Sequence, residues 1–151
     1  MHPADRIVVR ACGVAALALA MILAQERCAA ETVVGAHLGS RHWSDAPRNN
    51  VNPGAYVRLE SGLTVGAYRN SFYRPTLYVG MSWAIPGTPI DVTAALATGY
   101  DGHPYSSPIT VLLVPSIASP WLSDWRVRLS AVPRLSRNQD GVAHLSIESR
   151  F

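Results

Sequence analysis

The end of the chain alternates strictly between apolar and polar side chains. Over residues 143–151 one set of alternate positions is apolar or small, and the intervening set is polar or charged. The first set is Ala143, Leu145, Ile147, Ser149 and Phe151, and the second is His144, Ser146, Glu148 and Arg150. Successive side chains of a strand point to opposite faces of a sheet, so this segment is predicted to be a β-strand with one apolar and one polar face.

Seven earlier segments also have the length and composition of strands. Each is bounded by Gly, Pro, Asn, Asp or Ser, the residues that end strands and build turns. The eight predicted strands are 32–41, 55–60, 63–70, 74–84, 90–100, 109–118, 125–132 and 143–151. An even number of antiparallel strands can close up and down into a barrel without a free edge. We therefore predict an all-β fold, an eight-stranded antiparallel up-and-down β-barrel.

The alternation indicates which face meets which solvent. Strands 63–70, 74–84 and 125–132 also have aliphatic residues at one set of alternate positions and polar residues at the other. A secreted lipocalin-like barrel would have to bury Arg126, Arg128 and the charges of the last strand, or expose four aliphatic faces. A transmembrane barrel turns the same faces toward lipid and lumen. The terminal Phe151 is typical of bacterial outer-membrane proteins, and all four tryptophans lie at strand ends or in connections, where a membrane-interface girdle is expected.

The N-terminal segment predicts export. Arg6 and Arg10 precede an uncharged apolar run at 11–24, and the small residues Cys28 and Ala30 suit a signal peptidase. We expect residues 1–30 to be a cleaved signal peptide and 31–151 to be the barrel domain. The alternative, a membrane anchor, needs about 20 apolar residues, more than the run provides. Cleavage would also remove both cysteines, so the mature chain is expected to form no disulfide or thiolate metal site.

Composition excludes several other functions. The chain has arginine but no lysine, and its arginines are scattered instead of forming the basic stripe that nucleic-acid binding needs. It contains no metal-ligand spacing, no glycine-rich phosphate loop and no Gly-x-Ser-x-Gly hydrolase motif. We predict no cofactor and no metal. Membrane lipids are the expected partners, and the barrel is expected to be a monomer in the bacterial outer membrane.

The predicted topology gathers polar residues on one rim. If both chain ends face the periplasm, the longer connections 41–53, 70–73, 101–107 and 133–141 all lie at the outer end of the barrel. Their polar and titratable residues are His42, Asp45, Asn49, Asn50, Asn52, Asn70, Ser71, Asp101 and His103. A cluster of this kind is a candidate site. The alternative is that these residues only make the outer loops hydrophilic.

Several short motifs resemble the lipid A palmitoyltransferase family of outer-membrane acyltransferases. The stretch GLTVGAYRNS at 62–71 is similar to a strand of that family that rises to a Lys-Asp-Ser motif at the rim. The strand YVGMSW at 78–83 is similar to the family's Gly-x-Gly-Trp strand. PITVLLVP at 108–115 is similar to its proline-flanked Leu-Pro-Val-Leu-Leu-Pro strand, and Pro133 and the closing aromatic strand also match.

This resemblance implies transfer of an acyl chain from a phospholipid to lipid A by a rim His, Asp and Ser. Ser71 matches the serine, and Asn70 stands at the aspartate position. His42, expected at rim height, is the preferred histidine, and His37, expected inside the barrel, is the alternative. Histidine would act as general base on the acceptor hydroxyl, while a hydroxyl or amide stabilises the oxyanion. The amide of Asn70 has no charge and cannot stabilise an imidazolium as a carboxylate does. Asp45 or Asp101 would have to supply that negative charge.

The resemblance also implies that an acyl chain occupies the barrel interior. Ser82 stands at the position that sets the chain length in that family, and Gly66 and Gly80 could leave space near it. The alternative role of these glycines is to relieve strain where strands bend. The interior arginines of the last two strands are expected to pair with Glu148. His144 is expected to be a hydrogen-bonded lumen residue and not a catalyst. Two functions therefore remain open, an acyltransferase and a non-catalytic barrel that is structural or binds lipids or partners.

Overall fold

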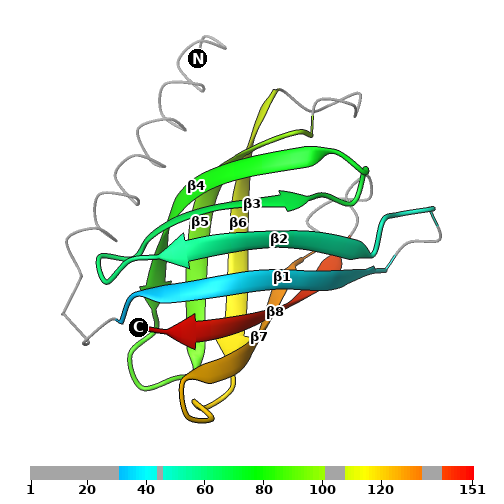
Figure 1. Cartoon of the computed structure of the whole chain (residues 1–151). Helices are drawn as coiled ribbons and strands as arrows, with labels where there is room; N and C mark the ends of the chain where they lie inside the picture. The colour runs from blue at the N-terminus through cyan, green and yellow to red at the C-terminus, as the bar shows by residue number, and fades with distance from the viewer. Residues whose placement is uncertain (1–30, 44–45, 101–107, 134–140) are drawn as a thin grey trace, which may run out of the picture.

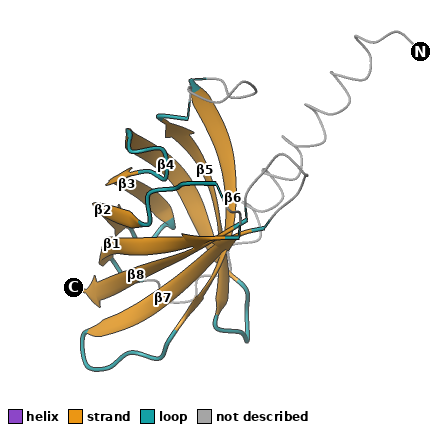
Figure 2. Ribbon diagram, turned by 90° about the vertical axis from the view of Figure 1, so that its right-hand side faces the viewer, coloured by secondary structure: helices purple, strands orange, loops and turns teal. Residues whose placement is uncertain are grey.

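A computed structural model describes residues 31–43, 46–100, 108–133 and 141–151. Its strands follow one another around a closed antiparallel barrel, and β8 pairs with β1 to complete it (Figure 1). The strands are β1 (Val33–His42), β2 (Val51–Arg58), β3 (Leu63–Arg69), β4 (Pro75–Ala84), β5 (Ile90–Thr98), β6 (Ile109–Ala118), β7 (Trp125–Val132) and β8 (Val142–Arg150). The predicted eight-stranded up-and-down barrel is confirmed. The described residues contain no helix long and apolar enough to span a membrane, and the described elements in Figure 2 are all strands.

Two strand boundaries differ from the sequence prediction for local reasons. β2 begins at Val51 instead of 55, because Val51 and Gly54 pair with Gly39 and His37 of β1. Pro53 does not interrupt this strand, although a proline cannot donate to a ladder. β5 ends at Thr98 instead of 100, because Gly99 has a φ of 82° that turns the chain out of the sheet.

The barrel is apolar outside and polar inside, as the alternation predicted. Leu77 of β4 is 65% exposed and Val111 of β6 is 74% exposed, whereas Glu148 of β8 is 1% exposed. Most of the buried residues are polar or charged. A barrel that folds around a hydrophobic core would show the opposite distribution, since apolar side chains normally fill the interior.

A bulge in β1 determines where the histidines point. His37 pairs with Ser146 of β8, but the register then shifts, so that Gly39 pairs with Leu145 and Ser40 with His144. An extra residue in one strand of an antiparallel pair shifts the alternation of its side chains. His37 and His42 would lie on opposite faces of a regular strand, and the bulge places both on the lumen side.

Among the described residues, β6 and β7 have the shortest pairing of any two neighbouring strands. β5 pairs with β6 along Ile90–Thr98, but β7 pairs with β6 only at Ser116, Ile117 and Ala118. Pro115 comes immediately before these residues, and Pro133 directly follows β7. Neither proline has an N–H to donate to a neighbouring strand. Within the described part of the chain, the β6–β7 ladder therefore ends at Ser116.

Candidate functional site

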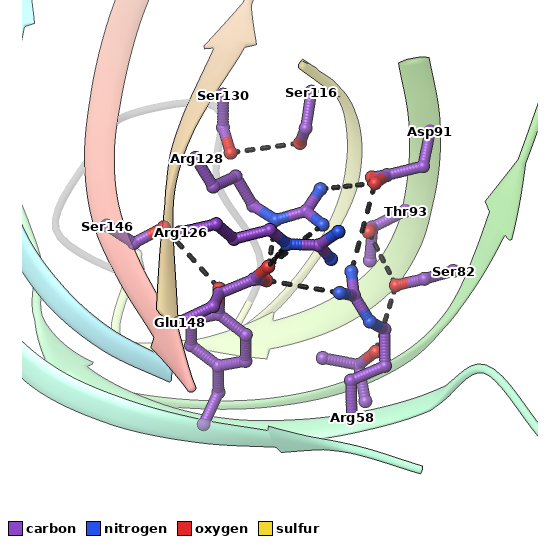
Figure 3. A network of polar contacts seen from close by, with 12 residues as sticks. Arg58, Ser82, Asp91, Thr93, Ser116, Arg126, Arg128, Ser130, Ser146 and Glu148 are labelled. Atoms are coloured by element: carbon purple, nitrogen blue, oxygen red, sulfur yellow. Dashed lines mark hydrogen bonds and ion pairs between the residues drawn. The ribbon is translucent and has the colours of Figure 1, made fainter. Parts of the chain in front are cut away.

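We call the end of the barrel at Val33 and Arg150 the inner end, and the end at His42 and Val142 the outer end or rim. The inner half of the lumen holds a buried charge cluster around Glu148 (Figure 3). The side chain of Glu148 has no solvent exposure. Its Oε2 accepts a hydrogen bond of 2.5 Å from Nε of Arg126, and its Oε1 accepts one of 2.6 Å from Nε of Arg128. The Tyr56 hydroxyl also donates to Oε1, at 2.6 Å. Buried charges are tolerated when they are paired in this way.

Two further residues extend the cluster across the barrel. Arg58 of β2 donates from Nη2 to Glu148 Oε1 at 3.2 Å, and its Nη1 lies 3.8 Å from Asp91 Oδ2. Arg128 forms a second ion pair with Asp91 of β5. The expectation that interior arginines pair with Glu148 is confirmed for β7. Arg150 instead pairs with Glu31 and Asp124 at the inner end of the barrel.

A layer of hydroxyl groups lies next to the charge cluster. Thr64 Oγ1 and Ser82 Oγ are 2.9 Å apart, and Ser82 Oγ and Thr93 Oγ1 are 2.7 Å apart. On the opposite wall, Ser116 Oγ and Ser130 Oγ are 2.9 Å apart. Ser82, the residue proposed to set acyl length, is therefore a member of this hydrogen-bonded layer.

The outer half of the lumen holds a histidine–tyrosine cluster. His37 Nδ1 lies 2.8 Å from His144 Nε2, and His37 Nε2 lies 2.9 Å from the Tyr78 hydroxyl. Nearby, the hydroxyls of Tyr68 and Tyr100 hydrogen-bond to each other. Burial raises the pKa of Tyr100 above its usual value, so its hydroxyl stays protonated at neutral pH. His144 has the partner expected of a hydrogen-bonded lumen residue.

A cavity of about 150 Å³ extends between the two clusters. Its wall combines His37, His144 and several tyrosines with apolar residues of β6, β7 and β8, among them Leu112, Val114, Val132 and Val142. An engineered cavity of about this volume binds a molecule the size of benzene. The cavity therefore accommodates a short apolar segment, and a long acyl chain would have to displace side chains.

The two interior glycines lie where neighbouring groups approach closely. A Cβ at Gly66 would lie 2.6 Å from the Tyr78 ring and 2.7 Å from Tyr56 Cβ. A Cβ at Gly80 would overlap the carbonyl oxygen of Ala94. Tyrosine side chains thus fill the volume beside Gly66, and strand backbone fills the volume beside Gly80.

Asn70 organises the outer rim. Its side chain is fully buried, and its Oδ1 accepts from the backbone N–H groups of Phe72 at 2.9 Å and Arg74 at 3.0 Å. Its Nδ2 donates to Thr76 Oγ1 at 3.0 Å and to the Gly99 carbonyl at 2.8 Å. These four bonds use the two N–H groups of the amide and two acceptor positions of its oxygen. Asn70 thereby joins the turn after β3 to β4 and to the end of β5.

Replacing Asn70 with Asp, the residue type that the resembled family has here, is expected to destabilise the barrel. A carboxylate cannot donate to Thr76 or Gly99, and it would face the Gly99 carbonyl oxygen. Each buried group left unsatisfied costs about 1–3 kcal/mol, so Asn70→Asp should lower the free energy of unfolding by at least about 1 kcal/mol. Urea unfolding followed by tryptophan fluorescence measures this. Asn50→Asp, at an exposed position, is the matched control; an equal effect of the two substitutions would contradict the structural role of Asn70.

His42 and Ser71, the two other predicted catalytic residues of the rim, have different hydrogen-bond partners. His42 ends β1, and its Nδ1 lies 3.0 Å from Asn50 Oδ1. Ser71 borders the cavity, and its carbonyl accepts from the backbone N–H of Asn49 at 2.9 Å. Within the described part of the chain, no hydrogen bond links His42 with Ser71. Three other predicted rim residues, Asp45, Asp101 and His103, lie outside the described residues.

Sequence reasoning did not single out four residues of the lumen clusters as part of a site. Arg58 and Asp91 complete the charge cluster, and Tyr68 and Tyr78 line the outer cavity. The available signal was their place in the alternation, since each is at a lumen-facing position of its strand. Among the described residues, no group of three or more His, Cys, Asp or Glu side chains is placed to hold a metal ion.

Comparisons with known proteins give one structural likeness. No family model and no curated protein matches the chain. The N-terminal β-barrel domain of Pseudomonas aeruginosa OprF has 15% sequence identity and a TM-score of 0.41, with 81% of this chain and 98% of that chain covered.

Proposed function

We propose that this chain is a small bacterial outer-membrane barrel that takes part of a lipid acyl chain into its outer half. Acyl transfer from a phospholipid to lipid A, the reaction that the sequence resemblance implies, is its proposed activity. The observation that carries the proposal is the lumen cavity, whose wall includes apolar residues of β6, β7 and β8. The signal peptide proposed for residues 1–30 would export it.

The outer surface supports the membrane location. Aliphatic side chains such as Leu77, Val111 and Leu113 are more than half exposed. They belong to β4 and β6, the two neighbours of β5 in the closed sheet. Water around such a surface is unfavourable, because each buried Å² of apolar surface contributes about 25 cal/mol. A closed barrel also satisfies its backbone internally, which the hydrocarbon of a bilayer requires.

The wall of the cavity supports access for lipid. Among the described residues the β6–β7 ladder ends at Ser116, and beyond it Leu112, Val114 and Val132 line the cavity with apolar side chains. An acyl chain of a bilayer lipid could enter the cavity beside these residues. The cavity volume limits the inserted part to a short segment.

The proposed chemistry uses the rim residues. His42 would take the proton of a lipid A hydroxyl as that oxygen attacks the phospholipid ester, and the Ser71 hydroxyl would donate to the oxyanion. The acyl–oxygen bond of the phospholipid then breaks, and the lysophospholipid leaves with the proton. Asn70, whose two N–H groups are already used, would position this rim without contacting the substrate.

A non-catalytic barrel is the second candidate. Two observations favour it: the His42 and Ser71 side chains share no hydrogen bond within the described residues, and the cavity is small for a long acyl chain. Such a barrel would bind lipids or partners at its polar rim without altering them.

Lipid A mass spectrometry distinguishes these functions. Expression of the chain in a lipid-A-producing host should add the mass of one acyl chain to lipid A. His42→Ala should reduce that product by about 100-fold or more, because general-base catalysis contributes about 10²–10⁴-fold. Arg41→Ala, the neighbouring exposed residue, is the control and should retain activity. Each variant should keep a heat-modifiable band on unboiled gels. Unchanged lipid A and phospholipids in cells that make the folded wild-type barrel would refute acyl transfer and favour the non-catalytic function.

A further inference from the structure

The buried charge cluster is not electrically balanced. It contains three guanidinium groups, from Arg58, Arg126 and Arg128, and two carboxylates, from Asp91 and Glu148. The formal charges of these groups are three positive and two negative. One positive charge therefore remains without a counter-charge inside the barrel, and a buried unpaired charge is strongly unfavourable.

Two acidic residues at the inner end of the barrel do not neutralise this positive charge. Glu31 and Asp124 pair with Arg150, and their side chains are 44% and 74% exposed. Charges in contact with water are screened and contribute little to a buried group. Arg126 packs against Trp121 at 4.2 Å from the ring centroid, and its guanidinium is not among the groups that line the cavity.

Two of the arginines border the cavity. Arg58 and Arg128 line its inner end, whereas Asp91 and Glu148 do not. Among the described residues, Arg58 hydrogen-bonds only through Nη2, while its Nη1 lies 3.8 Å from Asp91 Oδ2, beyond hydrogen-bond distance. Its other N–H groups could therefore donate to a ligand. The cavity floor thus combines excess positive charge with unused donors.

The hydroxyl layer adds polar groups at the same level. Thr64 lies opposite Arg58 in the β2–β3 pairing, and Ser82 and Thr93 continue the layer toward β5. All three residues line the cavity, as do Ser116 and Ser130 on the other wall. Figure 3 shows the labelled hydroxyls around the guanidinium groups.

We infer that the floor of the lumen cavity is a binding site for a small oxyanion, a phosphate or a carboxylate. Arg58 and Arg128 hold it by charge-assisted hydrogen bonds. Ser116 and Ser130, which share one hydrogen bond and so have one hydroxyl proton to spare, donate to a further oxygen. A guanidinium fork matches the geometry of oxyanions, and hydrogen bonds between charged partners are the stronger kind. This site is at the opposite end of the cavity from the rim and does not depend on acyl transfer.

Isothermal titration of phosphate into the full chain, purified from membranes in a non-ionic detergent, tests the site. The wild type should show saturable binding. Arg58→Gln should bind at least about tenfold more weakly, because it loses a charged hydrogen bond. Arg41→Gln, an exposed arginine of β1, should bind as the wild type does. Absence of saturable binding to the wild type, or equal affinity of R58Q and wild type, would overturn the inference.

A second pair of variants covers the case in which R58Q does not fold. Thr64→Asp places a carboxylate opposite Arg58 and supplies the missing negative charge within the chain, whereas Thr64→Asn has the same size without the charge. T64D should bind phosphate at least about tenfold more weakly than T64N. Equal affinity of T64D and T64N would contradict the site.

Other anions define the ligand class. Acetate should compete with phosphate, because a carboxylate offers the same fork of oxygens. Chloride at the same concentration should compete much less, since it cannot use the guanidinium forks and hydroxyls together. Competition by chloride as strong as that by acetate would overturn the assignment to oxyanions.

Discussion

Replacing Glu148 with Gln is expected to destabilise the barrel by about 3–5 kcal/mol, the cost of removing one partner of a buried ion pair. Glu148 faces three arginines and accepts the Tyr56 hydroxyl, and its side chain has no exposure to water. A neutral amide would leave three guanidinium groups with Asp91 alone. Urea unfolding of the folded barrel in vesicles, followed by tryptophan fluorescence, measures the change.

The control for this prediction is Glu60→Gln. Glu60 is an exposed carboxylate in the turn after β2, and surface substitutions of this kind usually change stability by less than about 0.5 kcal/mol. The double variant Arg126→Gln/Glu148→Gln removes one charge of each sign and should recover part of the loss. If E148Q and E60Q unfold at the same urea concentration, the charge cluster does not stabilise the barrel.

Replacing Val79 with Arg is the second large prediction. Val79 lies in the middle of β4, points outward and is 46% exposed. If the aliphatic surface faces hydrocarbon, an arginine there should cost about 2–4 kcal/mol, as measured for charges near the bilayer midplane. The same urea unfolding in phospholipid vesicles would detect this loss.

Leu59→Arg is the matched control for the membrane location. Leu59 follows β2 at the inner turn and is also partly exposed, so it should lie near the membrane interface, where the cost falls to about 0–1 kcal/mol. An unchanged stability of V79R, together with a chain that stays in solution without detergent, would show that water and not lipid surrounds the barrel.

The barrel could be predicted from sequence because apolar and polar residues alternate at every second position of its strands. Alternation at every second residue gave both the strands and their inward faces, as β7 shows: Arg126, Arg128 and Ser130 point inward and Leu129 points outward. The pairing of interior arginines with Glu148 followed from the same reasoning. Alternate side chains of a strand lie on the same face, so each face can be assigned without knowledge of any contact.

The details of the site could not be predicted, because they depend on register. The bulge after His37 shifts the alternation by one, and no residue type in 37–39 marks which position is inserted. Asn70 looked like a substituted catalytic aspartate, but its partners Thr76 and Gly99 belong to other strands and become neighbours only in the closed barrel. The charge excess became visible only when Arg58 and Asp91 were brought beside Glu148.

The last carboxylate of the charge cluster comes from the final strand. Arg58, Asp91, Arg126 and Arg128 all precede it along the chain, so a partly assembled sheet that lacks β8 holds three cationic side chains against a single acid. Glu148 supplies the second of the two negative charges at the same moment as β8 joins β1. Closure of the barrel and the loss of this repulsion are thus one event. We therefore expect that a chain that ends before Glu148 does not form a stable, partly closed barrel.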